Sequence, residues 1–346
     1  MNNFIYENRT KVYFGQGCVK EFLACLVRDA GNIMLAYGQG SVKRNGIYDE
    51  VLNILMKEGK HVTEFPGIMP NPTYQKVMEG ARLAREEKTE MILGVIVTTA
   101  GTGSECNGAA VITNEEQKVK TGHDYPKCNP AFALMDPAYT FSVPGGQMVS
   151  GAFDSLSHMM EAYFSEPDEQ NVSDEISEAL MRSVIKNIRQ AVRDPKDYTV
   201  RSNLLWSSAM SENRLIKLGK RCDFACHLME HQLSAYTGCS HSQGMSVLQP
   251  VYYRHIYRDG LDKFARFARN VWMIHEEGRN REEPAEAGVH ALADLIRETG
   301  LPSRLRDIGI KDRGQLKEIA DSCHYSPGAY RKLEAEEILE IFRECF

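Results

Sequence analysis

A carboxylate and a group of imidazoles recur at helical spacing in the second half of the chain. Asp154 and His158 are four residues apart, which places both side chains on one face of a helix. His227 and His231 repeat this spacing, and His241 follows ten residues later. A carboxylate and three imidazoles, without thiolates, form a plausible site for Fe²⁺, Zn²⁺, Ni²⁺ or Mn²⁺.

The same spacing also has a simpler interpretation. Two histidines four residues apart on a helix are commonly a partly buried polar face rather than a pair of metal ligands. Asp154, however, lies in the apolar helical segment from Gly151 to Phe164, where a buried carboxylate without a partner would be costly. Asp154 therefore requires a partner, and the rest of the chain must indicate whether that partner is a metal.

Length and composition restrict the class of protein. The chain has 346 residues, of which 42% are apolar and 25% charged, as in a soluble globular protein of about two domains. The net charge of −6 argues against a nucleic-acid or anionic-membrane partner. We find neither an apolar run of transmembrane length nor a signal-peptide pattern. The nine scattered cysteines contain no CxxC pair and predict reduced thiols, so we expect a cytoplasmic protein.

The first part of the chain alternates strand and helix patterns. The expected strands cover residues 11–14, 32–37, 61–65 and 91–97, and the expected helices cover 19–29, 45–57 and 71–87. This alternation predicts a doubly wound parallel sheet, in which a dinucleotide binds at the carboxyl ends of the strands.

Two loops that follow expected strands are candidates for phosphate binding. Gly38-Gln-Gly-Ser41 lies between a strand and a helix, where backbone N–H groups and the helix dipole favour an anion. It lacks the full GxGxxG pattern, so a plain strand-to-helix turn is equally consistent. Thr98-Thr-Ala-Gly-Thr-Gly-Ser-Glu105, here called the threonine loop, is the stronger candidate because hydroxyl and amide donors crowd the end of an apolar strand. A polar linker is the alternative.

From about residue 146 onward the pattern is helical. The expected helices cover residues 151–164, 173–192, 200–210, 226–235, 261–274, 286–298, 313–322 and 334–345. We therefore expect an α/β dinucleotide-binding domain over residues 1–145 and an all-helical metal and substrate domain over residues 146–346. Both parts of the predicted metal site lie in the second domain.

Together, these motifs resemble those of the iron-containing alcohol dehydrogenases, and most of all the butanol-dehydrogenase-like branch. The resemblance rests on the threonine loop, on Phe153-Asp-x3-His158 and on His227-x3-His231-x9-His241, and it extends over almost the whole chain. It implies an N-terminal α/β dinucleotide-binding domain, a C-terminal all-α metal-binding domain and a homodimer. It also implies hydride transfer between a nicotinamide cofactor and a small primary alcohol or aldehyde.

The resemblance implies roles for individual residues. The metal ligands would be Asp154, His158, His227 and His241, with His231 as a proton-relay residue near the nicotinamide. The cofactor contacts would come from Gly38, Gly40, Ser41, Thr98, Thr99, Thr102, Lys120 and Thr140. A bound Fe²⁺, Zn²⁺, Ni²⁺ or Mn²⁺ would act as a Lewis acid on the substrate oxygen. The protein would orient the cofactor for hydride transfer.

The first loop predicts NADP(H) in preference to NAD(H). Enzymes that prefer NAD often place a carboxylate at the ribose 2′-hydroxyl, where it would repel a 2′-phosphate. Here the loop is followed by Lys43 and Arg44, without an acid. The alternative is that these two residues are only the solvated, basic start of a helix.

One element expected from the resemblance is missing. The family has a Gly-Gly-Gly-Ser-x-x-Asp loop that holds the cofactor pyrophosphate, but here Met91–Gly94 runs directly into Val95–Thr98. Two neighbouring parallel strands need a crossover of a dozen or more residues, and none remain for it. Either one strand is missing from the sheet, or residues 91–97 form a hybrid strand that replaces two. In both cases we expect a truncated dinucleotide-binding domain with strongly reduced dinucleotide affinity.

Three functions are consistent with these observations. The favoured one is a metal-dependent NADP(H) alcohol dehydrogenase or aldehyde reductase. The second is a catalytically impaired metal-binding relative that has lost cofactor binding. The third is a metal-dependent lyase of the dehydroquinate-synthase-like type, which the threonine loop and Lys120 disfavour.

Overall fold

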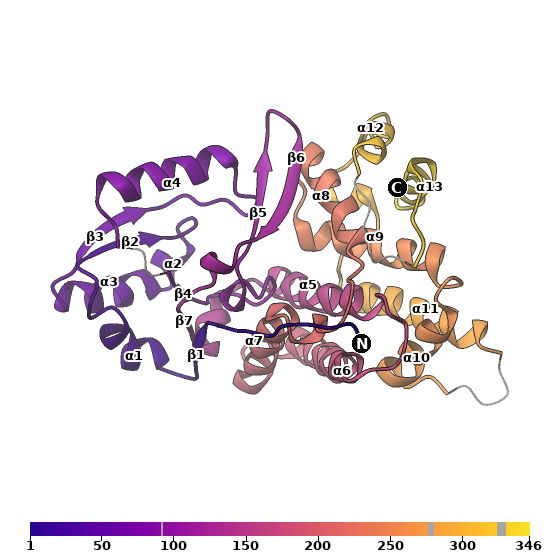
Figure 1. Cartoon of the computed structure of the whole chain (residues 1–346), viewed down its shortest axis with the longest axis horizontal. Helices are drawn as coiled ribbons and strands as arrows, with labels where there is room; N and C mark the ends of the chain where they lie inside the picture. The colour runs from indigo at the N-terminus through magenta and orange to yellow at the C-terminus, as the bar shows by residue number, and fades with distance from the viewer. Residues whose placement is uncertain (91–92, 276–279, 324–329) are drawn as a thin grey trace. The chain divides into compact units, whose positions relative to one another are not determined.

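The structure, a computed structural model of the whole chain, describes residues 1–90, 93–275, 280–323 and 330–346. It consists of two compact units, coloured by residue number in Figure 1. The α/β unit comprises Asn8–Thr99 and Ser104–Val143, and the helical unit comprises Met1–Glu7, Ala100–Gly103 and Pro144–Phe346. Two short segments that the sequence predicted to lie in the first domain thus belong to the helical unit.

The α/β unit follows the predicted alternation. Its elements are β1 (Lys11–Phe14), α1 (Cys18–Leu26), β2 (Asn32–Ala36), α2 (Ser41–Arg44), α3 (Ile47–Lys57), β3 (His61–Phe65), α4 (Tyr74–Glu86), β4 (Gly94–Ile96), β5 (Ala109–Asn114), β6 (Val119–Asp124) and β7 (Phe132–Met135). The helix expected over residues 45–57 begins only at Ile47, because Gly46 has a φ of 79° and separates α2 from α3. Residues 91 and 92, the start of the expected strand over 91–97, lie outside the described residues.

The parallel strands of this unit form two sheets rather than one. β2 pairs with β3, whereas β7 pairs with β1 on one side and with β4 on the other, all in parallel. Within the described residues, no hydrogen-bonded register joins β2 to β4. β4, which contains the predicted deletion point between Gly94 and Val95, and β2 therefore belong to different sheets.

An apolar cavity of about 120 Å³ lies between these two groups of strands. Most of its lining comes from β2, β4, β7, α1 and α3. The apolar side chains from these elements include Leu23, Leu26, Ile33, Leu35, Val51, Leu55, Ile96 and Phe132. Many of the same side chains form the hydrophobic core of the unit. The cavity thus lies where the two sheets of this unit are not joined by strand pairing.

Three strands of the α/β unit were not predicted from the sequence. β5 and β6 form an antiparallel hairpin in which Asn114 lies opposite Val119 (Figure 1). β7 is buried along its whole length and is the central strand of its sheet. A short, fully buried strand shows no alternation of polar and apolar residues, so its pattern does not distinguish it from a buried helix.

The helical unit contains α5 (Gly145–Tyr163), α6 (Val172–Arg193), α7 (Tyr198–Glu212), α8 (Ala225–Thr237), α9 (His241–Ile256), α10 (Leu261–Trp272), α11 (Glu282–Glu298), α12 (Leu316–Asp321) and α13 (Ala335–Glu344). α9 was not predicted, because Pro250 lies inside it and normally argues against a helix. α5 is buried over most of its length. Among the described residues, no helix is long and apolar enough to cross a membrane.

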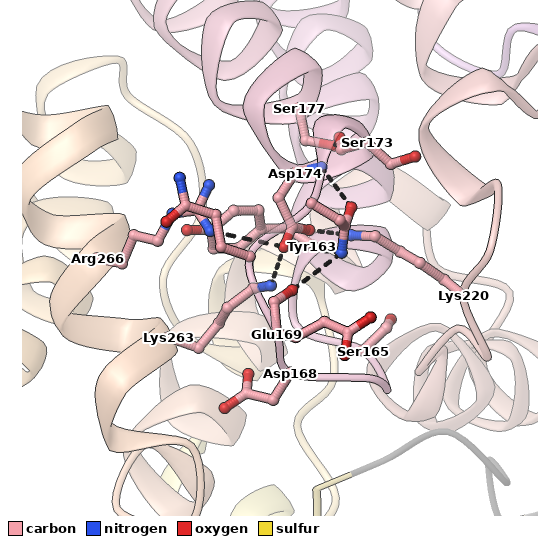
Figure 2. Close-up of polar contacts among 12 residues, drawn as sticks. Tyr163, Ser165, Asp168, Glu169, Ser173, Asp174, Ser177, Lys220, Lys263 and Arg266 are labelled. Atoms are coloured by element: carbon pink, nitrogen blue, oxygen red, sulfur yellow. Dashed lines mark hydrogen bonds and ion pairs between the residues drawn. The ribbon is translucent and has the colours of Figure 1, made fainter. Parts of the chain in front are cut away.

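A buried ionic network ties α6 to its neighbours (Figure 2). Asp174, in the first turn of α6, accepts hydrogen bonds from Lys220 and Lys263, and all three side chains are buried. Arg266 on α10 lies 3.8 Å from the Asp174 carboxylate and 2.7 Å from that of Glu178. Because buried charges are costly unless paired, this network fixes α6, α10 and the segment before α8 to one another.

Candidate metal centre

Three helices supply the four predicted metal ligands. Asp154 and His158 lie one turn apart on α5, His227 lies in the first turn of α8, and His241 is the first residue of α9. α8 ends at Gly238, whose φ of 69° is in the left-handed region. This conformation ends α8 and reverses the chain so that α9 begins close to it.

The four residues converge on one point. One donor atom from each lies within 4.8 Å of the donor atoms of the others. The rings of His158 and His227 stack with their centroids 4.6 Å apart. His241 Nε2 lies 3.4 Å from Asp154 Oδ1. The structure thus brings together residues that the sequence separates by up to 87 positions.

This cluster has the chemistry of a divalent-cation site. Asp154 Oδ1 and His158 Nδ1 are buried without a hydrogen-bond partner among the described residues. A buried acceptor without a hydrogen-bond partner lowers the stability of the folded chain by about 1–3 kcal/mol. A cation bound to the Asp154 carboxylate would remove this penalty. One carboxylate oxygen and three imidazole nitrogens suit Fe²⁺, Zn²⁺, Ni²⁺ and Mn²⁺. The residues present therefore fit a divalent metal ion.

His231 lies beside this cluster rather than within it. Its ring centroid is 5.5 Å from that of His241 and 6.3 Å from that of His227. Together with Glu230 and His241 it forms a second close group of possible donors. An imidazole in this position can exchange a proton close to the four converging side chains.

Two glutamates that the sequence did not single out contact the histidine ligands. Glu161 Oε2 contacts His227 Nδ1, and Glu230 Oε2 contacts His241 Nδ1. Glu161 lies one turn beyond His158 on α5, and Glu230 lies one turn beyond His227 on α8. Both contacts join two different helices, so the spacing along one helix did not reveal them.

The middle of the threonine loop lies against α5. Ala100–Gly103 belong to the helical unit, where the Gly101 N–H donates to Ser208 Oγ over 2.7 Å. Ser155 Oγ donates to the Gly101 carbonyl over 3.1 Å. This approach requires Gly151, because a Cβ at that position would lie 2.2 Å from a loop carbonyl oxygen. Ala100–Gly103 are thereby fixed next to the helix turn that carries Asp154.

The predicted cofactor residues come from several segments and from both units. Gly38, Gly40 and Ser41 form the turn from β2 into α2, and Thr98 and Thr99 follow β4. Thr102 lies in the helical unit. Lys120 is buried on β6, and the buried Thr140 donates from Oγ1 to the Pro137 carbonyl over 2.7 Å. In contrast to the four metal donors, these residues do not all belong to one unit.

The two basic residues after the first loop have different surroundings. Lys43 Nζ lies 3.3 Å from Glu64 Oε2 and 4.2 Å from the centre of the Tyr48 ring. Hydrogen bonds from Tyr37 and then Tyr48 hold the pKa of Glu64 below its usual value, so its negative charge offsets Lys43. The Arg44 guanidinium instead lies against Gly40 in the glycine turn. A Cβ added at Gly40 would be 3.1 Å from Arg44 Nη1. The sequence did not reveal that β3 brings an acid to this loop.

Glu105, at the end of the threonine loop, is a buried carboxyl group in the α/β unit. It is 4% exposed, and its Oε1 has no hydrogen-bond partner among the described residues. Burial raises its pKa to about 7. The group is therefore partly protonated at neutral pH.

Comparisons with family models cover most of the chain. The model described as "Fe-containing alcohol dehydrogenase family, C-terminal" matches residues 148–346. The model described as "Iron-containing alcohol dehydrogenase" matches residues 9–95 and 93–137. The second model therefore matches in two stretches that meet at residues 93–95, directly around β4.

Individual relatives extend over the full length. NADH-dependent butanol dehydrogenase A of Clostridium acetobutylicum is 33% identical, with 100% of both chains covered. That alignment has 390 positions against 346 residues here, so at least 44 positions have no counterpart in this chain. NADPH-dependent aldehyde reductase YqhD of Escherichia coli is 29% identical over 90% of each chain.

Solved structures give the same result. The crystal structure of NADH-dependent butanol dehydrogenase A from Thermotoga maritima matches with a TM-score of 0.93 and 31% identity. The match covers 100% of this chain and 99% of that chain. The predicted fold class, an N-terminal α/β dinucleotide-binding part followed by an all-helical part, is confirmed.

Proposed function

The chain belongs to the iron-containing alcohol dehydrogenase family, and on this premise we propose that it is a metal-dependent alcohol dehydrogenase or aldehyde reductase. It would transfer hydride between a nicotinamide cofactor and a small primary alcohol or aldehyde, with butanol and butanal as the model pair. The observation that carries this proposal is the convergence of Asp154, His158, His227 and His241 within the helical unit.

These four residues would hold the ion, with Fe²⁺ favoured and Zn²⁺, Ni²⁺ or Mn²⁺ compatible with the same donors. The ion supplies Lewis acidity toward the alcohol or carbonyl oxygen, and the cofactor supplies the hydride. The middle of the threonine loop, Ala100–Gly103, is hydrogen-bonded to Ser155 on α5 and to Ser208 on α7, which supports a role for this segment near the metal donors. His231 would take up or release a proton at a ring nitrogen as alcohol and aldehyde interconvert.

Family membership and thiol chemistry support two further features of this enzyme. The family resemblance favours a homodimer. All nine cysteines are free thiols, which suits the reducing conditions of the cytoplasm. Size-exclusion chromatography with light scattering would test the dimer, and a monomer would contradict it.

We propose NADP(H) as the preferred cofactor. Arg44 over the glycine turn supports this choice, because a guanidinium suits a 2′-phosphate. Among the relatives, the butanol dehydrogenase is named NADH-dependent and YqhD is named NADPH-dependent, so both preferences occur in the family. Arg44→Gln should weaken NADPH binding and leave NADH binding unchanged. An equal loss for both cofactors would contradict the assignment.

The α/β unit supports weak dinucleotide binding. β2 and β4 belong to different sheets, a cavity lies between them, and the family model matches in two stretches that meet at β4. These observations support a missing Gly-Gly-Gly-Ser-x-x-Asp segment, which in relatives would cradle the pyrophosphate. They also favour the competing function, a metal-binding relative that has lost cofactor binding.

A titration distinguishes the two functions. Purified protein is loaded with Fe²⁺ or Zn²⁺ and titrated with NADPH while nucleotide fluorescence is followed, and butanal is then added. Consumption of NADPH supports the oxidoreductase, and an ordinary micromolar affinity would contradict weak cofactor binding. Stoichiometric metal without nucleotide binding would favour the non-catalytic relative. His158→Ala serves as the metal-deficient control.

A further inference from the structure

Two buried glutamates contact the histidine ligands through the same ring nitrogen. Glu161 Oε2 contacts His227 Nδ1, and Glu230 Oε2 contacts His241 Nδ1. Glu161 is 1% exposed and Glu230 is 0% exposed. A buried carboxylate needs hydrogen-bond donors, and an imidazole with its proton on Nδ1 supplies one.

We propose that Glu161 and Glu230 are positioning residues of the metal centre. Each accepts a hydrogen bond from Nδ1 of a histidine ligand, fixes the tautomer and the ring orientation, and leaves Nε2 for the ion. The inference rests on the proposed four-donor metal site. It assigns Nε2 as the ligand atom of both His227 and His241. In agreement, His241 Nε2 is the nitrogen that lies 3.4 Å from Asp154 Oδ1.

Glu161 also positions the helix that carries His227. Its Oε1 accepts hydrogen bonds from the backbone N–H groups of Cys226, over 2.9 Å, and of His227, over 3.4 Å. Both groups lie in the first turn of α8, where N–H groups have no acceptor within their own helix. The N-cap residue of α8 is Phe224, whose side chain cannot accept a hydrogen bond. A carboxylate from α5 therefore caps α8 and orients its metal ligand at the same time.

Glu230 reaches His241 because a glycine lies opposite it. A Cβ at Gly244 would be 2.8 Å from Glu230 Cγ and 3.0 Å from Oε1. Gly244 lies one turn beyond His241 on α9. The absence of a side chain at residue 244 therefore allows Glu230 on α8 to approach the ring of the ligand on α9.

A second ion is the competing explanation for part of this arrangement. Glu230, His231 and His241 also place donor atoms within 4.8 Å of one another. The positioning role is favoured because it accounts for two equivalent contacts, one to His227 and one to His241. The two explanations differ in metal stoichiometry, since positioning predicts one ion per chain and a second ligand group predicts two.

The test measures metal binding directly. The wild-type chain, Glu161→Gln and Glu230→Gln are freed of metal and titrated with Co²⁺ against a chromophoric chelator, and the visible spectrum of bound Co²⁺ is recorded. We expect one ion per wild-type chain, affinity about 10- to 100-fold weaker in each variant, and an altered spectrum. Glutamine retains an oxygen that accepts the α8 backbone N–H groups, so Glu161→Gln separates ligand positioning from helix capping.

Two further variants control this experiment. Glu178→Gln is the matched control, because Glu178 is 5% exposed and contacts Tyr163 and Arg266 rather than a histidine. Its Co²⁺ affinity should stay within about twofold of wild type. Gly244→Ala displaces Glu230 without removing its charge and should weaken Co²⁺ binding in the same direction as Glu230→Gln. If Glu161→Gln does not fold, Glu230→Gln and Gly244→Ala decide the question.

The outcomes separate this inference from the proposed function. One ion per wild-type chain together with unchanged affinity and spectrum in the variants would overturn the positioning role and leave the metal site intact. Two ions per wild-type chain would overturn it in favour of Glu230 as a ligand. A wild-type chain that binds no divalent metal would overturn both the inference and the proposed function.

Discussion

The two units differ in how firmly packing and paired charges hold the elements that carry their proposed functional side chains. In the helical unit, two of the proposed histidine ligands each contact a buried glutamate, and a network of paired buried charges joins several helices. In the α/β unit, the described parallel strands fall into two sheets, and an apolar cavity lies between them. The four proposed metal donors therefore depend on the helical unit alone, whereas the predicted cofactor residues are divided between both units.

Removal of a metal donor should have the largest effect and tests the helical side of this comparison. His158→Ala deletes one of the four donors. We expect Co²⁺ affinity to fall by more than about 100-fold, since the loss of a partner that only supports a ligand already costs about 10- to 100-fold. Chelator competition measures this change. An affinity within about threefold of wild type would place the ion elsewhere.

A substitution in the buried ionic network should have the second-largest effect. Asp174→Asn leaves Lys220 and Lys263 buried without their carboxylate, so we expect a loss of about 3–5 kcal/mol in the free energy of unfolding. Urea unfolding followed by circular dichroism measures it. Asp321→Asn is the matched control, because it breaks the exposed Asp321–Lys317 pair, 3.0 Å apart, and should cost about 0.5 kcal/mol or less. Equal losses would contradict the view that the buried ionic network fixes the helices of this unit.

The buried carboxyl group of the α/β unit should give a pH-dependent effect. The pKa of Glu105 is about 7 in the folded chain against an ordinary 4.5, so the folded state binds this proton more tightly than the unfolded state. Glu105 therefore makes its full contribution to the free energy of unfolding below its ordinary pKa of 4.5. This contribution is lost as the pH rises through about 7.

Glu105→Gln carries no charge and does not titrate. Its free energy of unfolding should therefore increase relative to that of wild type as the pH is raised from 5 to 8. The gain should be at most on the order of 3 kcal/mol. Unfolding free energies at both pH values measure it. A difference that does not vary with pH would show that Glu105 does not titrate in this range.

Filling the cavity should give the smallest effect. Val51→Ile adds one methylene group to a side chain that lines the cavity, and burial of that group should add about 0.8 kcal/mol to the stability. Val184→Ile, at a buried position of α6, is the control and should be neutral or lose about 1–3 kcal/mol through overpacking. If both variants lose stability equally, the two units do not differ in packing.

The parts of this protein that could be predicted from the sequence are those with a local pattern. Asp154, His158, His227 and His241 were found because distinctive residue types recur at helical spacing. Glu161 and Glu230 occupy the same helices at similar spacing, but a single carboxylate on a helix indicates nothing until its partner on another helix is known. The role of Glu64 beside Lys43 likewise depends on the pairing of β2 with β3.

Elements without a local pattern were missed. β7 is fully buried and too short to show alternation, although it is the central strand of its sheet. The predicted deletion between Gly94 and Val95 was inferred from the sequence because a parallel crossover has a minimum length. The division of the described parallel strands into two sheets could not be predicted, since strand pairing depends on contacts between segments far apart in the chain.

The position of Ala100–Gly103 affects the order in which this protein can fold during synthesis. The α/β unit is not a continuous polypeptide, because the chain leaves it after Thr99 and re-enters it at Ser104. The two serines that bond Gly101 follow it by 54 and 107 residues. At about 5–20 residues per second, the ribosome needs roughly 5–20 s to add the more distant one. The N-terminal half therefore cannot finish folding as it emerges, and its threonine loop reaches its final conformation only when α5 and α7 have been made.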